Sequence, residues 1–284
     1  MARSTADDAG RTPRETAART SAGTDPDRNA VRERAALAND RIKGLARRTF
    51  SKQVLSEIGG FSGLFALDSE RFPIVLGGDC SILLGPMLAL RRRGRFGLVF
   101  IDGHADFQHP SDEPNGEVAS LDLALATGRG PVMLTDLDGL RPLVRDEDVA
   151  LVGYRAFGDN DHVLEEHIRD TAVTVIDLPE VREHGAARAV GKALGPVTRP
   201  DVEGFWVHLD VDVLDDDLMP AVDYRHPGGL TWEEAKEILR GLLRASGARG
   251  LEVTIFNPRL DPGGGLARRL SGLITNVIPA SRMR

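Results

Sequence analysis

Polar side chains gather at the ends of three apolar segments of the sequence, residues 72–79, 96–107 and 205–214. The polar residues are Asp79, Cys80 and Ser81 at the first segment, Asp102, His104 and Asp106 in the second, and His208, Asp210 and Asp212 in the third. Burial of apolar surface cannot explain carboxylates and imidazoles at these positions. A metal site is one explanation, and helix capping or hydration of exposed strand ends is the other.

The spacing of these residues favours the metal site. In a strand, residues i and i+2 point to the same face, so Asp102, His104 and Asp106 are predicted to converge, as are Asp210 and Asp212. Carboxylates brought together away from water repel one another unless cations neutralise them. Oxygen and nitrogen donors suit Mn²⁺, Fe²⁺, Co²⁺, Ni²⁺ or Zn²⁺, and two bridged ions would provide hydroxide at neutral pH.

Alternating strands and helices are predicted to position these residues. Further strand-like segments are residues 149–157, 173–178 and 251–258, and helical stretches are residues 82–93, 161–170, 186–194 and 232–245. Strands that are apolar throughout and alternate with helices indicate an α/β fold with a mainly parallel sheet covered on both faces, a three-layer α/β/α architecture. Ligands of such sheets bind beyond the carboxyl ends of the strands.

Composition limits the class of protein. The chain has 284 residues and a net charge of −7, which argues against a nucleic-acid partner. Its apolar runs are too short for a membrane span. A single cysteine excludes an internal disulfide, and the N-terminus lacks the apolar region of a secretory signal, so we expect a cytoplasmic protein. Residues 1–30 are predicted to be a disordered tail, helical periodicity begins near residue 29, and residues 31–284 are predicted to form one domain.

The motifs resemble those of the ureohydrolase family, which includes arginase, agmatinase and formiminoglutamase. They occur in the family's order as GGDCS (77–81), DGHADFQHP (102–110), HLDVDVLDDD (208–217) and GGLT (228–231). The resemblance covers roughly residues 70 to 280. It implies the arginase-like three-layer fold and hydrolysis of a linear C–N bond in a guanidino, ureido or related amidino compound. It also implies two divalent ions, in the first place Mn²⁺ with Fe²⁺, Ni²⁺ or Zn²⁺ as alternatives, and a trimer or hexamer.

Position by position, the resemblance also implies the site residues. The metal ligands would be Cys80, Asp102, His104, Asp106, Asp210 and Asp212. Asp106 would take up the proton of the attacking hydroxide, and His104 would be the second catalytic residue. Further residues near these motifs are candidates for contact with a small-molecule substrate: His208, Arg155, Glu252 and His226.

The departures from the family pattern point away from ordinary arginine hydrolysis. Cys80 replaces a metal-binding His, Ala119 stands where arginases have a His thought to shuttle protons, and Ile255 replaces the acid that holds the guanidinium. A charge-assisted contact of that kind is worth roughly 1.5–3 kcal/mol. Some relatives that act on ureido or N-hydroxyguanidino compounds also resemble this chain in having Cys at the first motif.

Two other hypotheses stay open on the sequence. One is a catalytically altered or inactive homologue that binds a ligand or partner. The other is a hydrolase with Cys80 as nucleophile, which would need a nearby His as base. His208 could line the pocket or support it by a hydrogen bond, and His109 is more simply a loop residue.

Overall fold

The fold is built around one parallel β-sheet, seen in a computed structural model that describes residues 72–108, 117–156 and 168–282. Within these described ranges, six strands pair in the order β1-β6-β5-β2-β3-β4, and all of their pairings are parallel. The strands are β1 Ile74–Leu76, β2 Gly97–Ile101, β3 Val149–Val152, β4 Thr174–Ile176, β5 Phe205–Asp210 and β6 Ala248–Thr254. The predicted parallel α/β architecture is therefore confirmed.

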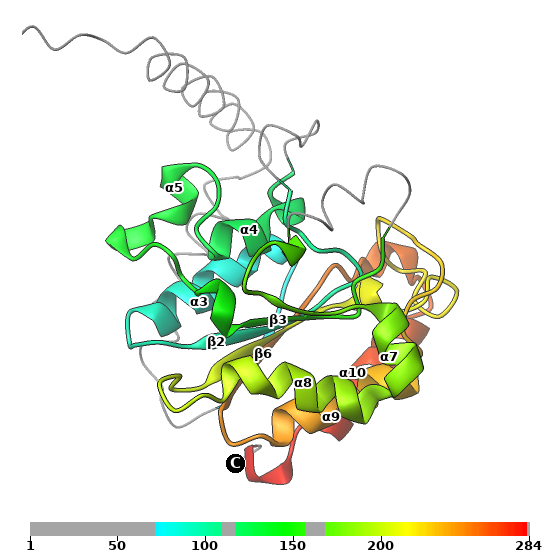
Figure 1. The fold of residues 1–284 in the computed structure, drawn as a ribbon. Helices are drawn as coiled ribbons and strands as arrows, with labels where there is room; N and C mark the ends of the chain where they lie inside the picture. Colours follow the sequence, from blue (N-terminus) through cyan, green and yellow to red (C-terminus); the bar gives the residue numbers. More distant parts are fainter. Residues whose placement is uncertain (1–71, 109–116, 157–167, 283–284) are drawn as a thin grey trace, which may run out of the picture. The chain divides into compact units, whose positions relative to one another are not determined.

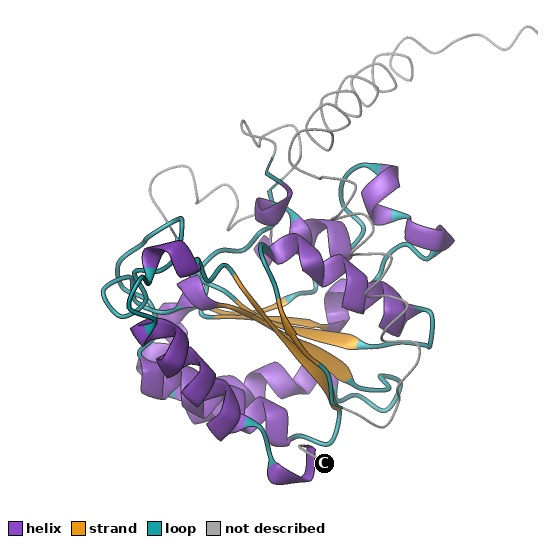
Figure 2. Ribbon diagram, turned by 180° about the vertical axis from the view of Figure 1, so that it is seen from behind, coloured by secondary structure: helices purple, strands orange, loops and turns teal. Residues whose placement is uncertain are grey.

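Helices cover both faces of this sheet (Figures 1 and 2). On one face lie α3 Leu84–Arg91, α4 Asp122–Ala126 and α5 Val132–Thr135, and on the other α7 Leu178–His184, α8 Ala186–Val197, α9 Trp232–Arg244 and α10 Gly265–Val277. Short 3-10 helices are η1 Cys80–Leu83, η2 Val118–Ser120, η3 Leu137–Gly139, η4 Asp146–Asp148, η5 Val211–Val213, η6 Pro258–Leu260 and η7 Ala280–Arg282. Each helical layer closes its own apolar core against the sheet.

Strand alternation decides which side chains enter which core. In β5, Phe205, Val207 and Leu209 pack on the α7–α10 side, whereas Trp206 packs on the α3–α4 side. Because side chains alternate along a strand, His208 and Asp210 share the side of Trp206. In β6, Leu251 and Val253 face α7–α10, so Glu252 and Thr254 face the opposite side. Four polar side chains from two central strands thus point toward the same helical layer.

The strands end earlier than the apolar segments predict. β2 stops at Ile101, so Asp102, His104 and Asp106 lie beyond the strand rather than within it, and Asp212 lies in η5 rather than in β5. The expectation that strand alternation brings Asp102, His104 and Asp106 to one face is therefore wrong. Apolar runs fail to mark strand ends here because the loops that follow are also buried, as Ala105 and Val211 show.

The start of α9 agrees with the sequence in detail. Thr231 Oγ1 accepts a hydrogen bond from the Glu234 amide, and the Glu234 carboxylate accepts one from the Thr231 amide, so the two residues form a capping box of the T-x-x-E pattern.

Replacement of Thr231 by Ala is expected to lower the free energy of unfolding by about 1 kcal/mol, because the Glu234 amide loses its partner. Urea denaturation of the purified protein measures the change. Thr275→Ala is the matched control, since Thr275 is exposed within α10 and caps no helix end. An equal loss of stability in both variants would contradict a specific capping effect.

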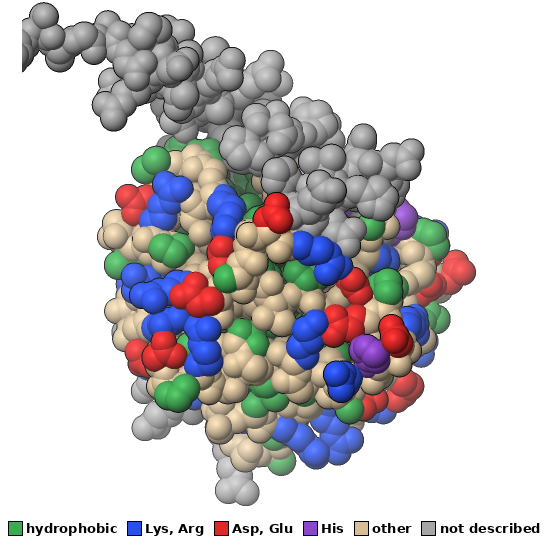
Figure 3. All heavy atoms as spheres, in the orientation of Figure 1, with side chains coloured by type: hydrophobic (Ala, Val, Ile, Leu, Met, Phe, Trp, Pro, Cys, Tyr) green, Lys and Arg blue, Asp and Glu red, His purple; other side chains and the backbone are tan. Residues whose placement is uncertain are grey.

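Some expectations fall outside the described residues, namely the tail at residues 1–30, the helical periodicity up to residue 67, His109, and most of the helix expected at 161–170. Within the described part, no helix is long and apolar enough to span a bilayer. On the face drawn in Figure 3, acidic and basic side chains of the described residues are interspersed rather than gathered into one basic field.

Candidate metal centre

Tight turns, rather than strand alternation, bring the polar residues together. At the end of three strands an Asp carboxylate accepts a hydrogen bond from the backbone amide two residues later, which is the Asx-turn arrangement. The donor–acceptor pairs are Ser81 N to Asp79 Oδ1 at 2.9 Å, His104 N to Asp102 Oδ1 at 2.6 Å, and Asp212 N to Asp210 Oδ1 at 2.7 Å. In each case the Asp and the residue two positions later are held together at the carboxyl edge of the sheet by this hydrogen bond.

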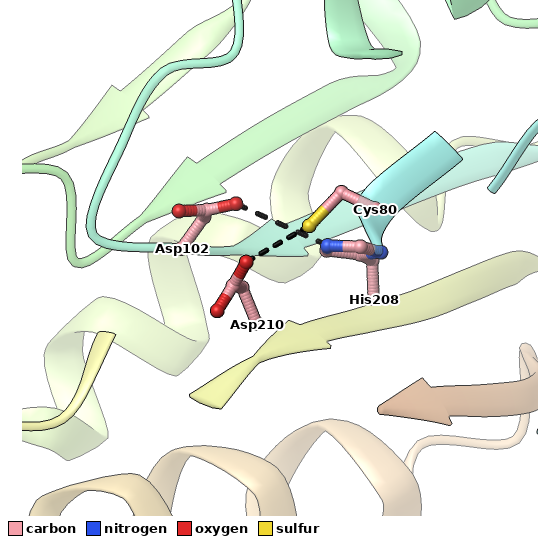
Figure 4. Close-up of side chains that lie close together, drawn as sticks. All are labelled: Cys80, Asp102, His208 and Asp210. Carbon is pink, nitrogen blue, oxygen red and sulfur yellow. Dashed lines mark hydrogen bonds and ion pairs between the residues drawn. The ribbon is translucent and has the colours of Figure 1, made fainter. Parts of the chain in front are cut away.

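A first group of possible metal ligands consists of Cys80, Asp102, His208 and Asp210 (Figure 4). One ligand atom from each of the four lies within 4.8 Å of the others, and all four residues are buried. The Cys80 thiol donates to Asp210 Oδ2 at 2.8 Å, and His208 Nε2 lies 3.9 Å from Asp102 Oδ2. Cys80 is the first residue of η1, Asp102 directly follows β2, and His208 and Asp210 belong to β5.

A second group consists of Asp102, His104 and Asp212, so Asp102 belongs to both groups. His104 Nδ1 lies 3.0 Å from Asp212 Oδ2 and 3.6 Å from Asp102 Oδ1. The His104 side chain is 32% exposed, whereas Asp102 is fully buried. The second group therefore meets solvent through His104.

Charge is compensated within the protein at Asp212 but not at the buried acids of the first group. Burial opposes the charged form of Asp212, but His104 and then Arg155 outweigh it and lower its pKa. Burial, followed by the charge of Asp212, raises the pKa of both Asp102 and Asp210. Burial and then Asp210 hold the pKa of the Cys80 thiol well above its usual value. Burial opposes the charged form of His104, but the carboxylates of Asp212 and Asp102 outweigh it and raise its pKa. Anionic donors crowded in this way fit cations, which relieve the repulsion.

Two further carboxylates lie close to these groups. Asp106 is buried and has a left-handed backbone with φ of 44°, and it belongs to neither group. Asp122, the first residue of α4, is fully buried, and burial holds its pKa well above the usual value. Our reading of the sequence missed Asp122. The sequence does contain a signal for it, namely an acid within the apolar stretch LDLALA (121–126). Burial of a charged residue in such a helix is unfavourable, so it indicates that the residue has a function.

A third acidic group, Asp215, Asp216 and Asp217, has a structural explanation. Asp215 accepts hydrogen bonds from the amides of Asp217 and Gly228, and Arg225 forms ion pairs with Asp216 and Asp217. We therefore do not include this group in the candidate site.

Comparisons with known proteins fit this arrangement. Residues 47–278 match the family model described as "Arginase family". The chain belongs to the arginase family.

Individual relatives are distant. The chain is 31% identical over 212 residues to the arginase of Brevibacillus brevis, covering 74% of this chain and 70% of the relative. It is 27% identical to an arginase of Staphylococcus aureus strain MRSA252, covering 74% and 68%. The crystal structure of arginase from Bacillus cereus superposes with a TM-score of 0.72 at 26% identity, covering 80% of this chain and 78% of that one. The arginase-like fold expected from the motifs is confirmed.

Ile255 and Ala119, two of the positions at which the sequence was compared with the family motifs, both lie in the described part of the chain. Ile255 follows β6 with φ of 67°, a left-handed conformation that is strained for a β-branched residue. Its amide donates to Gly78 O at 2.8 Å, which ties the end of β6 to the turn that carries Cys80. Ala119 lies in η2 and offers no side chain able to carry a proton.

The four residues predicted to contact substrate differ in their surroundings. His208 and Glu252 are fully buried and joined by a contact of 2.6 Å between His208 Nδ1 and Glu252 Oε1. The Arg155 guanidinium donates to the backbone carbonyls of Asp212, Val213 and His226, so it supports the turn after β5. His226 is partly exposed in the loop before α9. Substrate contact by these residues stays a prediction.

Burial also bears on Cys80 as a nucleophile. Its side chain is 1% exposed, and its thiol contacts Asp210 and, at 3.3 Å, the Thr254 hydroxyl. Reactive cysteines are partly exposed and lie in electropositive surroundings that favour the thiolate, which is the opposite of this environment. The geometry favours a ligand role for Cys80 over nucleophilic catalysis.

Proposed function

We propose that this protein is a metal-dependent hydrolase that cleaves a linear C–N bond in a guanidino, ureido or related amidino compound. The observation that carries the proposal is the pair of ligand groups that share Asp102 at the carboxyl edge of the sheet. Two divalent ions held there would supply Lewis acidity and a hydroxide nucleophile at neutral pH. Mn²⁺ is the expected ion by family resemblance, with Fe²⁺, Ni²⁺ and Zn²⁺ as alternatives because thiolate donors favour softer ions.

The residues around the two groups have separate tasks in this proposal. Asp106, buried beside the shared carboxylate, accepts the proton of the nucleophile and passes it to the leaving amine. His104, the partly exposed ligand, lies on the side from which a small-molecule substrate would approach. Arg155 fixes the turn that contains Asp212, and His226 is the proposed contact for the distal end of the substrate.

The substrate is expected to be less basic than arginine. The family's guanidinium-binding acid is replaced by Ile255, and the nearest acid on the same strand, Glu252, is fully buried and already bonded to His208. A cationic guanidinium would lose the charged partner, whereas a ureido or other neutral group would not need it. We expect a cytoplasmic enzyme, since a thiol ligand has to stay reduced, and a trimer or hexamer by family resemblance.

The test combines a substrate panel with metal analysis. Guanidino, ureido and formimino compounds are assayed with Mn²⁺, Fe²⁺, Ni²⁺ and Zn²⁺, and the metal content of the purified protein is measured. Asp212→Asn is expected to lose metal and turnover together, because Asp212 is a donor of the second group. Asp106→Asn is expected to abolish turnover. Full activity in either variant would contradict the assignment.

A second candidate function is an inactive homologue that binds a ligand or partner. The replacements at Ala119 and Ile255 favour it, because two groups used by arginases are missing. Metal content separates the two candidates: two ions per chain support the enzyme, and none after incubation with all four metals supports the inactive homologue.

A further inference from the structure

We propose that His208 is itself a metal ligand, binding through Nε2 in a site formed with Cys80, Asp102 and Asp210, and that Glu252 holds its ring in position. This inference rests on the proposed function only in requiring that metal ions bind at this edge of the sheet. It changes the ligand set, since the family resemblance does not include His208 or Glu252 among the metal-binding residues.

The sheet register places His208 in a row of three side chains. His208 on β5 pairs with Phe100 on β2 and with Glu252 on β6. Such neighbours on one face of a sheet are in direct contact. The next row toward the carboxyl edge pairs Asp210 with Thr254, and Asp102 follows the end of β2. His208 therefore lies directly beneath the carboxylates of the candidate site.

Two polar atoms that face each other across this site have no hydrogen-bond partner among the described residues. They are His208 Nε2 and Asp102 Oδ2, which lie 3.9 Å apart and belong to residues with zero exposure. Buried polar atoms without partners are rare and costly in folded proteins. Two ligands of one ion, each bonded at about 2.0–2.3 Å, lie about 3–4.5 Å apart, so an ion between these atoms would satisfy both.

The other ring nitrogen explains why Nε2 is the one available. His208 Nδ1 lies 2.6 Å from Glu252 Oε1, and the ring stacks on Phe100 with centroids 4.3 Å apart and planes 3° from parallel. With the Nδ1 proton donated to Glu252, the lone pair of Nε2 points toward Cys80, Asp102 and Asp210 (Figure 4). A metal-ligating His almost always donates its other N–H to a carboxylate or carbonyl in this manner.

The donor set of this site differs from that of the second group. One sulfur, one imidazole nitrogen and two carboxylate oxygens form a set that suits Zn²⁺ or Co²⁺, whereas carboxylate-rich sites suit harder ions such as Mn²⁺. Replacement of a family His by Cys80 thus need not leave the site without an imidazole, because His208 supplies one from the neighbouring strand. The two sites of one chain are expected to differ in metal preference.

The experiment counts imidazoles bound to the metal. Wild-type protein and the His104→Ala variant are loaded with Zn²⁺, and X-ray absorption spectra report the imidazole and sulfur neighbours of the ion. With His208 as a ligand, His104→Ala keeps an imidazole-bound and sulfur-bound zinc. His208→Ala and His208→Gln are expected to lose that imidazole and to weaken zinc binding at the Cys80 site. Glu252→Gln is expected to weaken it about 10–100-fold.

His184→Ala is the matched control, since His184 is an exposed residue of α7 that belongs to neither ligand group. This variant should leave both the spectrum and the zinc affinity unchanged. Zinc bound to sulfur without imidazole in His104→Ala would overturn the proposal, as would unchanged affinity in both His208 variants. If the His208 variants fail to fold, the spectrum of His104→Ala decides alone.

These outcomes are separable from a failure of the proposed function. Wild-type protein that binds two ions and hydrolyses a compound of the panel, yet shows no imidazole in His104→Ala, would retain the function and overturn only the role of His208. Wild-type protein that binds none of the metals would overturn both.

Discussion

Replacement of Asp102 by Asn is expected to remove metal binding at both sites and with it all turnover. Asp102 is the only residue shared by the two ligand groups of the described chain, and it is fully buried, so water cannot replace its carboxylate easily. Loss of an outer-shell partner typically costs about 10–100-fold in metal affinity, and loss of a shared ligand should cost more at each site. Isothermal titration with Zn²⁺ and Mn²⁺, together with elemental analysis, measures the change.

The same variant should fold at least as well as the metal-free wild type. Burial and the charge of Asp212 already raise the pKa of Asp102, so the neutral Asn removes a destabilising charge without changing the size of the side chain. Asp217→Asn is the matched control, because Asp217 is exposed and belongs to the acidic group explained by Arg225. Asp102→Asn protein that still binds two ions with wild-type affinity would show that the groups do not share this ligand.

The sequence predicts more of the site's composition than of its geometry. Asp102, His104, Asp210 and Asp212 were identified from their spacing, and the structure brings them together, but through Asx turns and not along strands. An Asp followed two residues later by another polar residue is compatible with both a strand and an Asx turn. Both structures place residues i and i+2 near each other. Only the position of the strand end distinguishes them, and buried loops hide that position in the sequence.

Contacts between distant strands account for what the sequence leaves open. The role of His208 depends on Glu252, which is 44 residues away in the chain and opposite it in the sheet. No spacing rule relates two strands whose order in the sheet is unknown. His208 and Glu252 are in contact because β5 and β6 are neighbours in the sheet, and the sequence does not reveal that order.

The metal-free protein is expected to lose stability as pH rises from 5 to 8. Asp102, Asp106, Asp122 and Asp210 have pKa values above the usual 3.8 because they are buried. Between the unfolded and the folded pKa the native state holds more protons than the unfolded state, so stability is lost as pH increases. The raised pKa of His104 acts in the same direction, because its contribution is complete below about pH 6.5 and is lost as pH rises from there through the raised folded pKa.

Metal-loaded protein should behave in the opposite way, which makes the difference between the two forms diagnostic. Ligands must be deprotonated to bind a metal, so the affinity for the ions increases with pH. A free metal concentration of about 1,000 times Kd stabilises the native state by about 4 kcal/mol, which corresponds to a rise of roughly 8–16 °C in Tm for a domain of this size. Scanning calorimetry of loaded and chelator-treated protein at pH 5, 6.5 and 8 is expected to show a gap that widens with pH. The Asp102→Asn variant should show little gap at any pH. A metal-free protein that gains stability between pH 5 and 8 would mean that the buried carboxylates are balanced within the chain, and that cations are not what the site requires.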